Sequence, residues 1–191
     1  MVLFMESTVL TVIIAAVAGV FLWSIMEYTL HRFLGHDRRT MPNFFSVEHS
    51  RHHREGNYFA PAIKKAGAAL VVTLAVLPLA VLVVGWLAGA VFTAAFVTMY
   101  ATYEFIHRRA HTHPGIGPYG RFVRRHHFHH HFGNPRSNHG VTSPVWDLVF
   151  GTFEKSDKIR VPARMAMSWL VDADGQVHPE FRDHYEIASR R

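Results

Sequence analysis

The sequence predicts an all-α integral membrane protein in which about three transmembrane helices carry a cytoplasmic helical cap. The apolar residues of the 191-residue chain are gathered into long blocks, and all 20 Lys and Arg residues lie outside those blocks. This alternation is typical of a membrane protein whose basic segments stay on the cytoplasmic side. In addition, the 16 histidines lie outside the apolar blocks, many of them at helical spacing, which places the chemistry of the protein in the cap.

The first apolar block covers residues 8–30, with Glu27 as its only charge. As a helix it spans roughly 34 Å, enough to cross a bilayer core of about 30 Å. A cleaved signal peptide is the alternative, but basic residues ahead of the block and a small-residue cleavage site are both missing. We therefore expect a transmembrane helix.

The second apolar block, residues 66–106, is uncharged apart from Glu104. A continuous helix of this length would span roughly 60 Å, twice what one crossing needs. Two crossings are therefore expected, at about residues 67–85 and 88–106, with a turn near the glycines at 85 and 89. Buried helices of a soluble protein are the alternative, but the polar face that a surface helix needs is absent.

The basic residues also set the expected orientation. Seven lie in residues 31–65 and 13 in residues 107–191, with none in the apolar blocks. A basic balance can indicate phosphate binding, but this placement follows the positive-inside rule, so no nucleic-acid partner is expected. We expect the amino terminus outside, and the histidines and the carboxyl terminus in the cytoplasm.

Cysteine is absent from the sequence, which removes disulfides, thiolate metal sites and iron–sulfur clusters. Histidine and carboxylate remain as strong metal ligands. Twice, a predicted membrane helix ends in a carboxylate just before histidines: Glu27 precedes His31, and Glu104 precedes His107 and His111. Because metal-bound imidazoles often donate to a carboxylate, each Glu is expected to orient a ligand. A glutamate reaching the membrane edge beside surface histidines is the alternative for the first pair.

Two histidine triplets have the spacing i, i+3, i+4, which places their members on one helix face. One is His49, His52 and His53, on a helix expected to begin after Pro42 and Asn43; the other is His127, His130 and His131. Such a face suits the chelation of one ion or of two neighbouring ions. A solvated polar face is the alternative for a single triplet. Taken together, the pairs and triplets predict a histidine-rich dinuclear metal site in the cap.

Four motifs resemble the histidine boxes of the fatty acid hydroxylase and sterol desaturase superfamily. They are HRFLGH at residues 31–36, HSRHH at 49–53, HRRAH at 107–111, and HHFHH within the last run, whose box is residues 127–131. The segments EYTLHRFLGH and NHGVTSPVWDLVFGT resemble the fatty acid 2-hydroxylase branch more than the β-carotene hydroxylase branch. The resemblance covers roughly residues 23–153.

This resemblance implies ten ligands for two iron ions: His31, His36, His49, His52, His53, His107, His111, His127, His130 and His131. It also implies that Glu27, Glu104, Asn138 and Asp147 support those ligands. Zinc could occupy the same nitrogens in purified protein. Four further histidines are not expected as ligands: His113, His126 and His129 exceed the box pattern, and His139 stands where the family generally has an aromatic residue.

The implied function is O2-dependent hydroxylation of a long-chain lipid, with an acyl chain as the first choice. Electrons would come from a separate cytochrome b5-like or ferredoxin-like protein. A sterol or carotenoid hydroxylase or desaturase of the same superfamily is the alternative. A metal transporter is disfavoured because these histidines lie outside the apolar segments, and a haem cytochrome because it needs only a few histidines.

The whole chain, residues 1–191, is expected to form one domain with a polar tail at residues 154–191. In that tail, residues 171–175 resemble the start of a calcium loop. A calcium loop would need glycine at its sixth place and glutamate at its twelfth, but here glycine falls fourth and the twelfth place is Asp183. A simple turn is predicted instead. His178 and His184 are expected at the surface.

Overall fold

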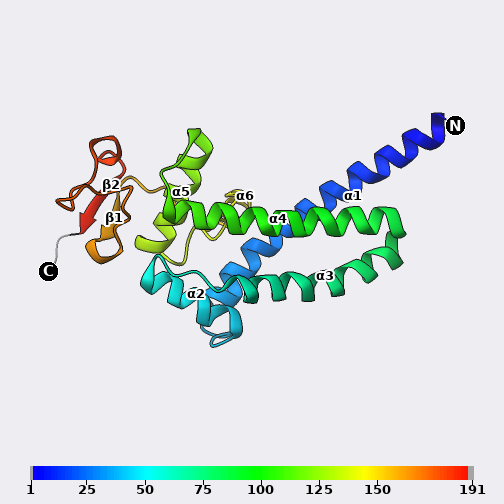
Figure 1. Ribbon diagram of the computed structural model, residues 1–191, viewed down its shortest axis with the longest axis horizontal. Coiled ribbons are helices and arrows are strands. Elements are labelled where there is room, and N and C mark those ends of the chain that lie inside the picture. The colour runs from blue at the N-terminus through cyan, green and yellow to red at the C-terminus, as the bar shows by residue number, and fades with distance from the viewer. Residues whose placement is uncertain (1, 189–191) are drawn as a thin grey trace. The chain divides into compact units, whose positions relative to one another are not determined.

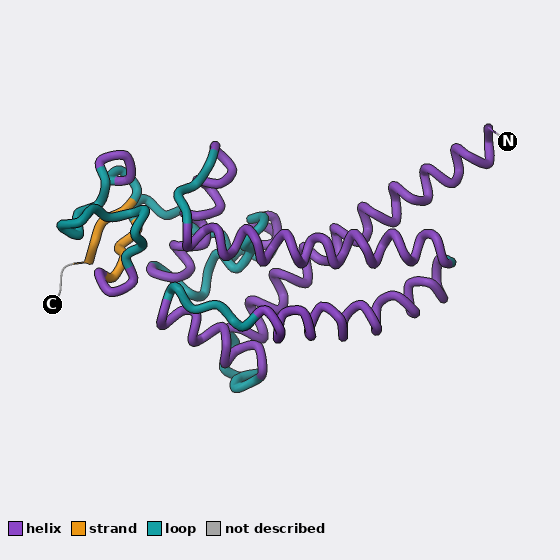
Figure 2. Tube along the Cα trace, in the orientation of Figure 1, coloured by secondary structure: helices purple, strands orange, loops and turns teal. Residues whose placement is uncertain are grey.

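The computed structural model describes residues 2–188, which are mostly helical (Figures 1 and 2). The longer elements, in chain order, are α1 Val2–Thr29, the π-helical turn η1 Leu30–Gly35, α2 Phe44–Glu55, α3 Ala62–Val84, α4 Trp86–Thr112, α5 Gly117–Phe132, α6 Val145–Val149, β1 Ile159–Pro162 and β2 Tyr185–Ala188. The expected mostly helical character is confirmed, whereas the small sheet near the carboxyl-terminal end departs from an all-α fold.

The chain divides into two compact units. The first unit comprises Met1–Met26 and Ala60–Glu104, and the second comprises Glu27–Phe59 and Phe105–Arg191. Three helical segments are long and apolar enough to cross a membrane: Ser7–Gly35, Ala62–Val84 and Trp86–Thr112, with mean hydropathies of 2.5, 2.7 and 1.3. These three candidate spans coincide with the three stretches in which the sequence predicted crossings.

Small residues let the helices of the first unit pack closely. The chain turns between α3 and α4 at Gly85, whose φ of 81° is in the left-handed region that favours glycine. At Gly89, an added Cβ would lie 2.6 Å from the backbone nitrogen of Val81, so only glycine allows α3 and α4 to approach there. From α1, the Trp23 ring contacts Phe96 edge-on, with ring centroids 5.4 Å apart.

In the second unit, α2 begins where the sequence predicted. The side chain of Asn43 accepts hydrogen bonds from the backbone N–H groups of Phe45 and Ser46, and Ser46 Oγ accepts one from the Asn43 N–H. This reciprocal pair is a capping box, which satisfies backbone donors that a helix start leaves unpaired. The α2 histidines are thus held on a well-defined helix.

The polar tail is instead a folded subdomain, which corrects the all-α expectation. Strands β1 and β2 pair in parallel, and Ile159, Val161 and Tyr185 join a core with Phe128 of α5. With only four residues per strand, the apolar alternation is too short to be recognised in the sequence. The predicted turn is confirmed, because Asp172 Oδ1 accepts hydrogen bonds from the N–H groups at 174 and 176.

Candidate metal centre

The second unit gathers the ten predicted ligands into two groups of five imidazoles. The first cluster is His31, His36, His49, His53 and His130, and the second cluster is His52, His107, His111, His127 and His131. In each cluster, one nitrogen from every ring lies within 4.8 Å of the others. All ten rings are buried or half-buried. Four boxes that are far apart in the sequence therefore make two separate five-nitrogen sites.

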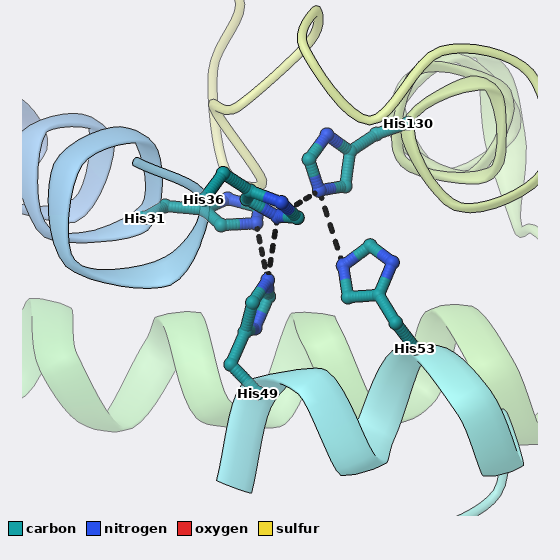
Figure 3. A group of neighbouring side chains, drawn as sticks. All are labelled: His31, His36, His49, His53 and His130. Carbon is teal, nitrogen blue, oxygen red and sulfur yellow. Dashed lines mark hydrogen bonds between the residues drawn. The ribbon is translucent and has the colours of Figure 1, made fainter. Parts of the chain in front are cut away.

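Helical spacing explains how one helix serves both clusters. On α2, His49 and His53 are one turn apart and face the first cluster. His52, rotated by about 60° from His49 and about 100° from His53, faces the second. The same division separates His130 from His127 and His131 on α5. Figure 3 shows the first cluster, in which His36 lies just beyond the end of η1 and α5 closes the site with His130.

The nitrogens of the first cluster are spaced as ligands of one ion would be. The Nε2 atom of His49 lies 3.1 Å from that of His31 and 2.8 Å from that of His36. The Nε2 atom of His130 lies 2.9 Å from that of His36 and 3.2 Å from that of His53 (Figure 3). Two ligands at about 2.05 Å from a metal and about 90° apart would be about 2.9 Å from each other. The donor set therefore fits a bound transition metal.

The second cluster fits a metal equally well. Its Nε2 atoms lie 2.9 Å apart in the pair His52 and His107, and 2.9 Å apart in the pair His111 and His127. Both ring nitrogens of His131 are buried and have no hydrogen-bond partner among the residues that the structure describes. A buried polar atom without a partner costs free energy, and a metal ion would supply the missing interaction for one of these nitrogens.

Backbone carbonyls determine which nitrogen of three ligands carries the proton. Nδ1 of His130 lies 2.7 Å from the carbonyl oxygen of Ser137, and Nδ1 of His52 lies 2.7 Å from that of Tyr58. Nδ1 of His31 is bonded to the carbonyl of His139. A carbonyl can only accept, so each Nδ1 is the N–H donor and each Nε2 carries a lone pair. Each of these three Nε2 atoms therefore presents a lone pair to its cluster, as a metal ligand must.

Six ligand imidazoles outside the membrane-spanning segments have lowered pKa values that keep them neutral. Burial lowers the pKa of His36 to about 4. Burial, followed by repulsion from neighbouring histidines, lowers the pKa of five more ligands well below 6.5: His49, His53, His127, His130 and His131. Neutral imidazole is the form that binds metal, so these ligands are ready at neutral pH without losing a proton.

Glu27 supports the first cluster through the loop at residues 137–142. Its Oε1 accepts hydrogen bonds from the N–H groups of Val141, at 2.6 Å, and Thr142, at 2.7 Å. The carbonyl of His139, in the same loop, accepts a hydrogen bond from Nδ1 of His31, the role that the sequence predicted for the Glu27 carboxylate. Glu27 thus positions the acceptor that orients this ligand.

Asp147 holds the same loop from α6. Its carboxylate accepts hydrogen bonds from the N–H groups of His139 and Gly140, each at 2.8 Å, from Thr152 Oγ1 at 2.7 Å, and from His126 Nε2 at 3.0 Å. Burial alone would raise the pKa of Asp147, but the bonds from His126 and Gly140 lower it. Asp147 is therefore a buried carboxylate that secures the carbonyl acceptors of the first cluster.

The two remaining residues that were expected to support the ligands are Asn138 and Glu104. Asn138, at a φ of 56°, accepts a hydrogen bond from the Glu154 N–H at 2.8 Å and donates one to its carbonyl at 2.9 Å, which closes the loop. Glu104 forms an ion pair with Lys65, which α3 carries on its first turns, inside the first unit. Support of a histidine of α4 by Glu104 stays a prediction.

The extra histidines lie outside both clusters. His126 pairs with Asp147, His129 with Glu154 at 3.0 Å, and His113 with the hydroxyl of Thr112 at 2.8 Å. His139 is nearest, with its ring centroid 5.2 Å from that of His130, and its Nε2 donates to the Arg136 carbonyl at 3.2 Å. Sequence reasoning missed the carbonyl acceptors at 58, 137 and 139, because a backbone carbonyl leaves no residue-specific signal.

Comparison with known proteins agrees with this geometry. The family model for fatty acid hydroxylase matches residues 16–152, which include all four histidine boxes. The chain is 31% identical to the fatty acid 2-hydroxylase of Macaca fascicularis over 145 residues, covering 70% of this chain and 38% of that protein. It is 33% identical to the ceramide very long chain fatty acid hydroxylase SCS7 of Saccharomyces cerevisiae, covering 71% of this chain and 36% of that protein.

The fold is also similar to a solved structure, full-length scs7p with only the hydroxylase domain visible. The TM-score is 0.60 at 24% identity, with 81% of this chain and 65% of that chain covered. The chain thus spans less than half the length of the two relatives named above. Since the family model matches well over half of the sequence and includes every residue of both clusters, the chain belongs to the fatty acid hydroxylase family.

Proposed function

We propose that this chain is a membrane-bound oxygenase that uses O2 and electrons from a separate protein to hydroxylate the acyl chain of a lipid. The observation that carries the proposal is the pair of buried five-imidazole clusters. The names of relatives that span a longer chain, fatty acid 2-hydroxylase and ceramide very long chain fatty acid hydroxylase, support the substrate class.

Two iron ions would be bound, one in each cluster. Imidazole nitrogens do not select iron over zinc by softness, so zinc in a purified sample would be compatible with an iron enzyme. When bound, the iron would supply the activation of O2 that hydroxylation of an unactivated C–H bond requires. Carboxylate-rich di-iron sites of soluble bundles use Glu ligands, whereas these clusters are built from histidine alone.

The protein's own residues would hold and shield this centre. The carbonyls at 58, 137 and 139 orient three of the ligand rings, so that Nε2 points into each cluster without rotating. Burial of the ligands excludes water and keeps their imidazoles neutral. Both effects favour metal retention, because protons compete with metal for the same lone pairs.

An acyl-chain substrate is supported by the three helices that are apolar enough to cross a bilayer, where such chains reside. A sterol or carotenoid substrate is the alternative within the family. A haem cytochrome is disfavoured, because the three remaining imidazoles of each cluster would occupy the space that porphyrin nitrogens need. The electron donor would be a cytochrome b5-like or ferredoxin-like carrier.

For the orientation, we propose that the amino terminus lies outside and that both clusters and the carboxyl terminus face the cytoplasm. The distribution of Lys and Arg supports this. Because the chain has no cysteine, single cysteines at Ser7 and Ser156 can be labelled with an impermeant reagent on sealed vesicles. Labelling from opposite sides is expected, and labelling of both from one side would contradict the orientation.

The activity is tested by expression under isotope-labelled O2, followed by mass spectrometry of total lipid. We expect labelled oxygen in an acyl chain only with the intact protein. His130→Ala and His52→Ala each remove one ligand, from the first and second cluster respectively, so each should retain about one ion where the intact protein holds two. His178→Ala is the control and should keep both ions. If the intact protein labels no lipid in the presence of iron and a reductant, the enzyme proposal is wrong.

A further inference from the structure

In the short helix α6, the charged side chain is buried and apolar side chains are exposed, which is the reverse of a helix on a water-facing surface. Its one charged residue, Asp147, is fully buried, whereas Val145 is 52% exposed, Leu148 61% and Val149 62%. Phe150, just after the helix, is 47% exposed. Complete burial of one such side chain stabilises the buried state by about 1.5–3 kcal/mol relative to leaving the side chain in water. This face therefore needs an apolar partner.

The orientation of α6 is fixed from the inside. Asp147 accepts hydrogen bonds from the backbone of His139 and Gly140 and from the side chains of His126 and Thr152. Rotating α6 to hide its apolar residues would break these bonds and leave the buried N–H groups of His139 and Gly140 without their acceptor, which is unfavourable. The apolar face is thus held outward by the same residue that supports the first metal cluster.

Contacts within the second unit join this face to the end of a membrane-spanning helix. The rings of Phe150 and Tyr28 are stacked, with centroids 5.3 Å apart, and the Tyr28 hydroxyl lies 2.9 Å from Thr152 Oγ1. Tyr28 belongs to the apolar segment Ser7–Gly35. The exposed apolar residues after position 144 therefore lie next to the end of that apolar segment.

The side chains around the face have the chemistry of a membrane interface. Arg32 donates to the Tyr28 hydroxyl at 2.8 Å, and its guanidinium lies 5.2 Å from the ring centroid of the exposed Phe33. Trp146 is half-buried, with its ring 6.0 Å from that of Phe150. Trp and Tyr are enriched where headgroups meet acyl chains, and Arg can pair with lipid phosphate there.

We propose that the partner of this face is the lipid bilayer, with Val145, Leu148, Val149 and Phe150 inserted at the boundary between headgroups and acyl chains. The bilayer then supports α6 from outside while Asp147 holds the metal-site loop from inside. Lipid contact on one face of a five-residue helix is thereby linked to the carbonyl that orients His31. The inference depends on insertion of the chain in a membrane and not on its activity.

The test uses the absence of native cysteine. Leu148→Cys is labelled with a nitroxide in the full chain, reconstituted in vesicles of phosphatidylcholine and phosphatidylglycerol. Collision rates are measured with O2, which concentrates in the bilayer, and with a water-soluble nickel complex. Leu74→Cys, exposed on α3, is the bilayer reference, and Asp183→Cys, exposed in the carboxyl-terminal subdomain, is the aqueous reference. A second label at Val145→Cys repeats the measurement independently.

The expected ratio of oxygen to nickel collisions at Leu148 and Val145 is severalfold above that at Asp183 and approaches that at Leu74. A ratio equal to that at Asp183 would overturn the proposal. Protection from both reagents would also overturn it, because it would mean that a second copy or another protein covers the face. If the ratio at Leu74 itself equals that at Asp183, the chain is not inserted in the membrane. This outcome is distinct from failure of α6 docking alone. Retained metal in the labelled variants verifies that they are folded.

Discussion

The ligand rings are oriented by residues that are themselves held in place by buried carboxylates. Glu27 and Asp147 both accept hydrogen bonds from backbone N–H groups of the loop at residues 137–142. The carbonyls at 137 and 139 in turn accept hydrogen bonds from His130 and His31. Both of these histidines belong to the first cluster. Damage to the loop should therefore weaken one metal site and spare the other.

Asp147→Asn tests this dependence. The amide keeps the size of the side chain but replaces one accepting oxygen with a donor, so it cannot accept bonds from His139, Gly140, Thr152 and His126 together. We expect the metal affinity of the first cluster to fall roughly 10–100-fold, the range found for partners of ligating histidines. Competition with a chelator measures the affinity of each site.

Glu186→Gln is the matched control, because Glu186 is a partly exposed carboxylate of β2 that pairs with Arg160 and Lys158. It should change the affinity of either cluster by less than about twofold, as expected for an exposed pair. Equal loss from both clusters in Asp147→Asn, or no loss from either, would contradict the role assigned to the loop.

At the scale of elements, Arg124 of α5 secures the end of α4. The guanidinium donates to the carbonyl of Ala110 at 2.9 Å and also to those of Arg109 and His113, which lie at the last turn of α4 or just beyond it. The Trp169 ring of the carboxyl-terminal subdomain lies 4.3 Å from the guanidinium carbon. Burial lowers the pKa of Arg124 to about 10. One buried side chain thus joins two histidine-bearing helices and the subdomain.

Arg124→Lys should lower the free energy of unfolding by about 2 kcal/mol, because an ammonium cannot reproduce the fork of donors that serves several carbonyls. Arg125→Lys is the control: this neighbour is only half-buried and contacts His184 at 3.2 Å, so a change below about 0.5 kcal/mol is expected. Thermal unfolding in detergent compares the two. Because α4 carries His107 and His111, Arg124→Lys should also lose metal from the second cluster first. Equal effects of the two variants would contradict this role of Arg124.

At the scale of the whole molecule, the buried imidazoles make the stability of the metal-free protein depend on pH. An unfolded histidine has a pKa near 6.5, whereas His36 in the folded chain has a pKa of about 4 and five other ligands lie well below 6.5. Between these values the unfolded chain binds more protons than the folded chain. Linkage then requires the free energy of unfolding to rise with pH in that window.

We therefore expect the unfolding temperature of metal-free protein in detergent to rise as pH increases from about 4 to about 6.5, and to be nearly constant from about 6.5 to 8. The stability is fully present above the unfolded pKa and is lost as pH falls towards the folded one. A scan of unfolding temperature against pH after chelator treatment measures this. A temperature that falls as pH rises through the lower window would contradict neutral, buried ligands.

The sequence by itself determined the helices and the ten histidines, because both depend on local patterns. Apolar blocks of sufficient length predict crossings, and the spacing i, i+3, i+4 places side chains on one helix face. The box pattern of the family then separated the ten from neighbours such as His126 and His129. The turn at residues 171–175 was equally local, since Asp172 bonds only to residues within four positions of itself.

Only the tertiary structure decided how those histidines are shared and supported. Helical spacing cannot say which helix lies opposite, so the separation of His52 from His49 and His53 depends on where α4 and η1 meet α2. Helical spacing also cannot locate acceptors that are backbone carbonyls. Nor can it show that Asp147 of α6 accepts hydrogen bonds from a loop that folds back onto this helix. The carboxyl-terminal sheet was missed for a related reason: its apolar residues are buried by a partner strand and by α5, contacts between segments far apart in the sequence.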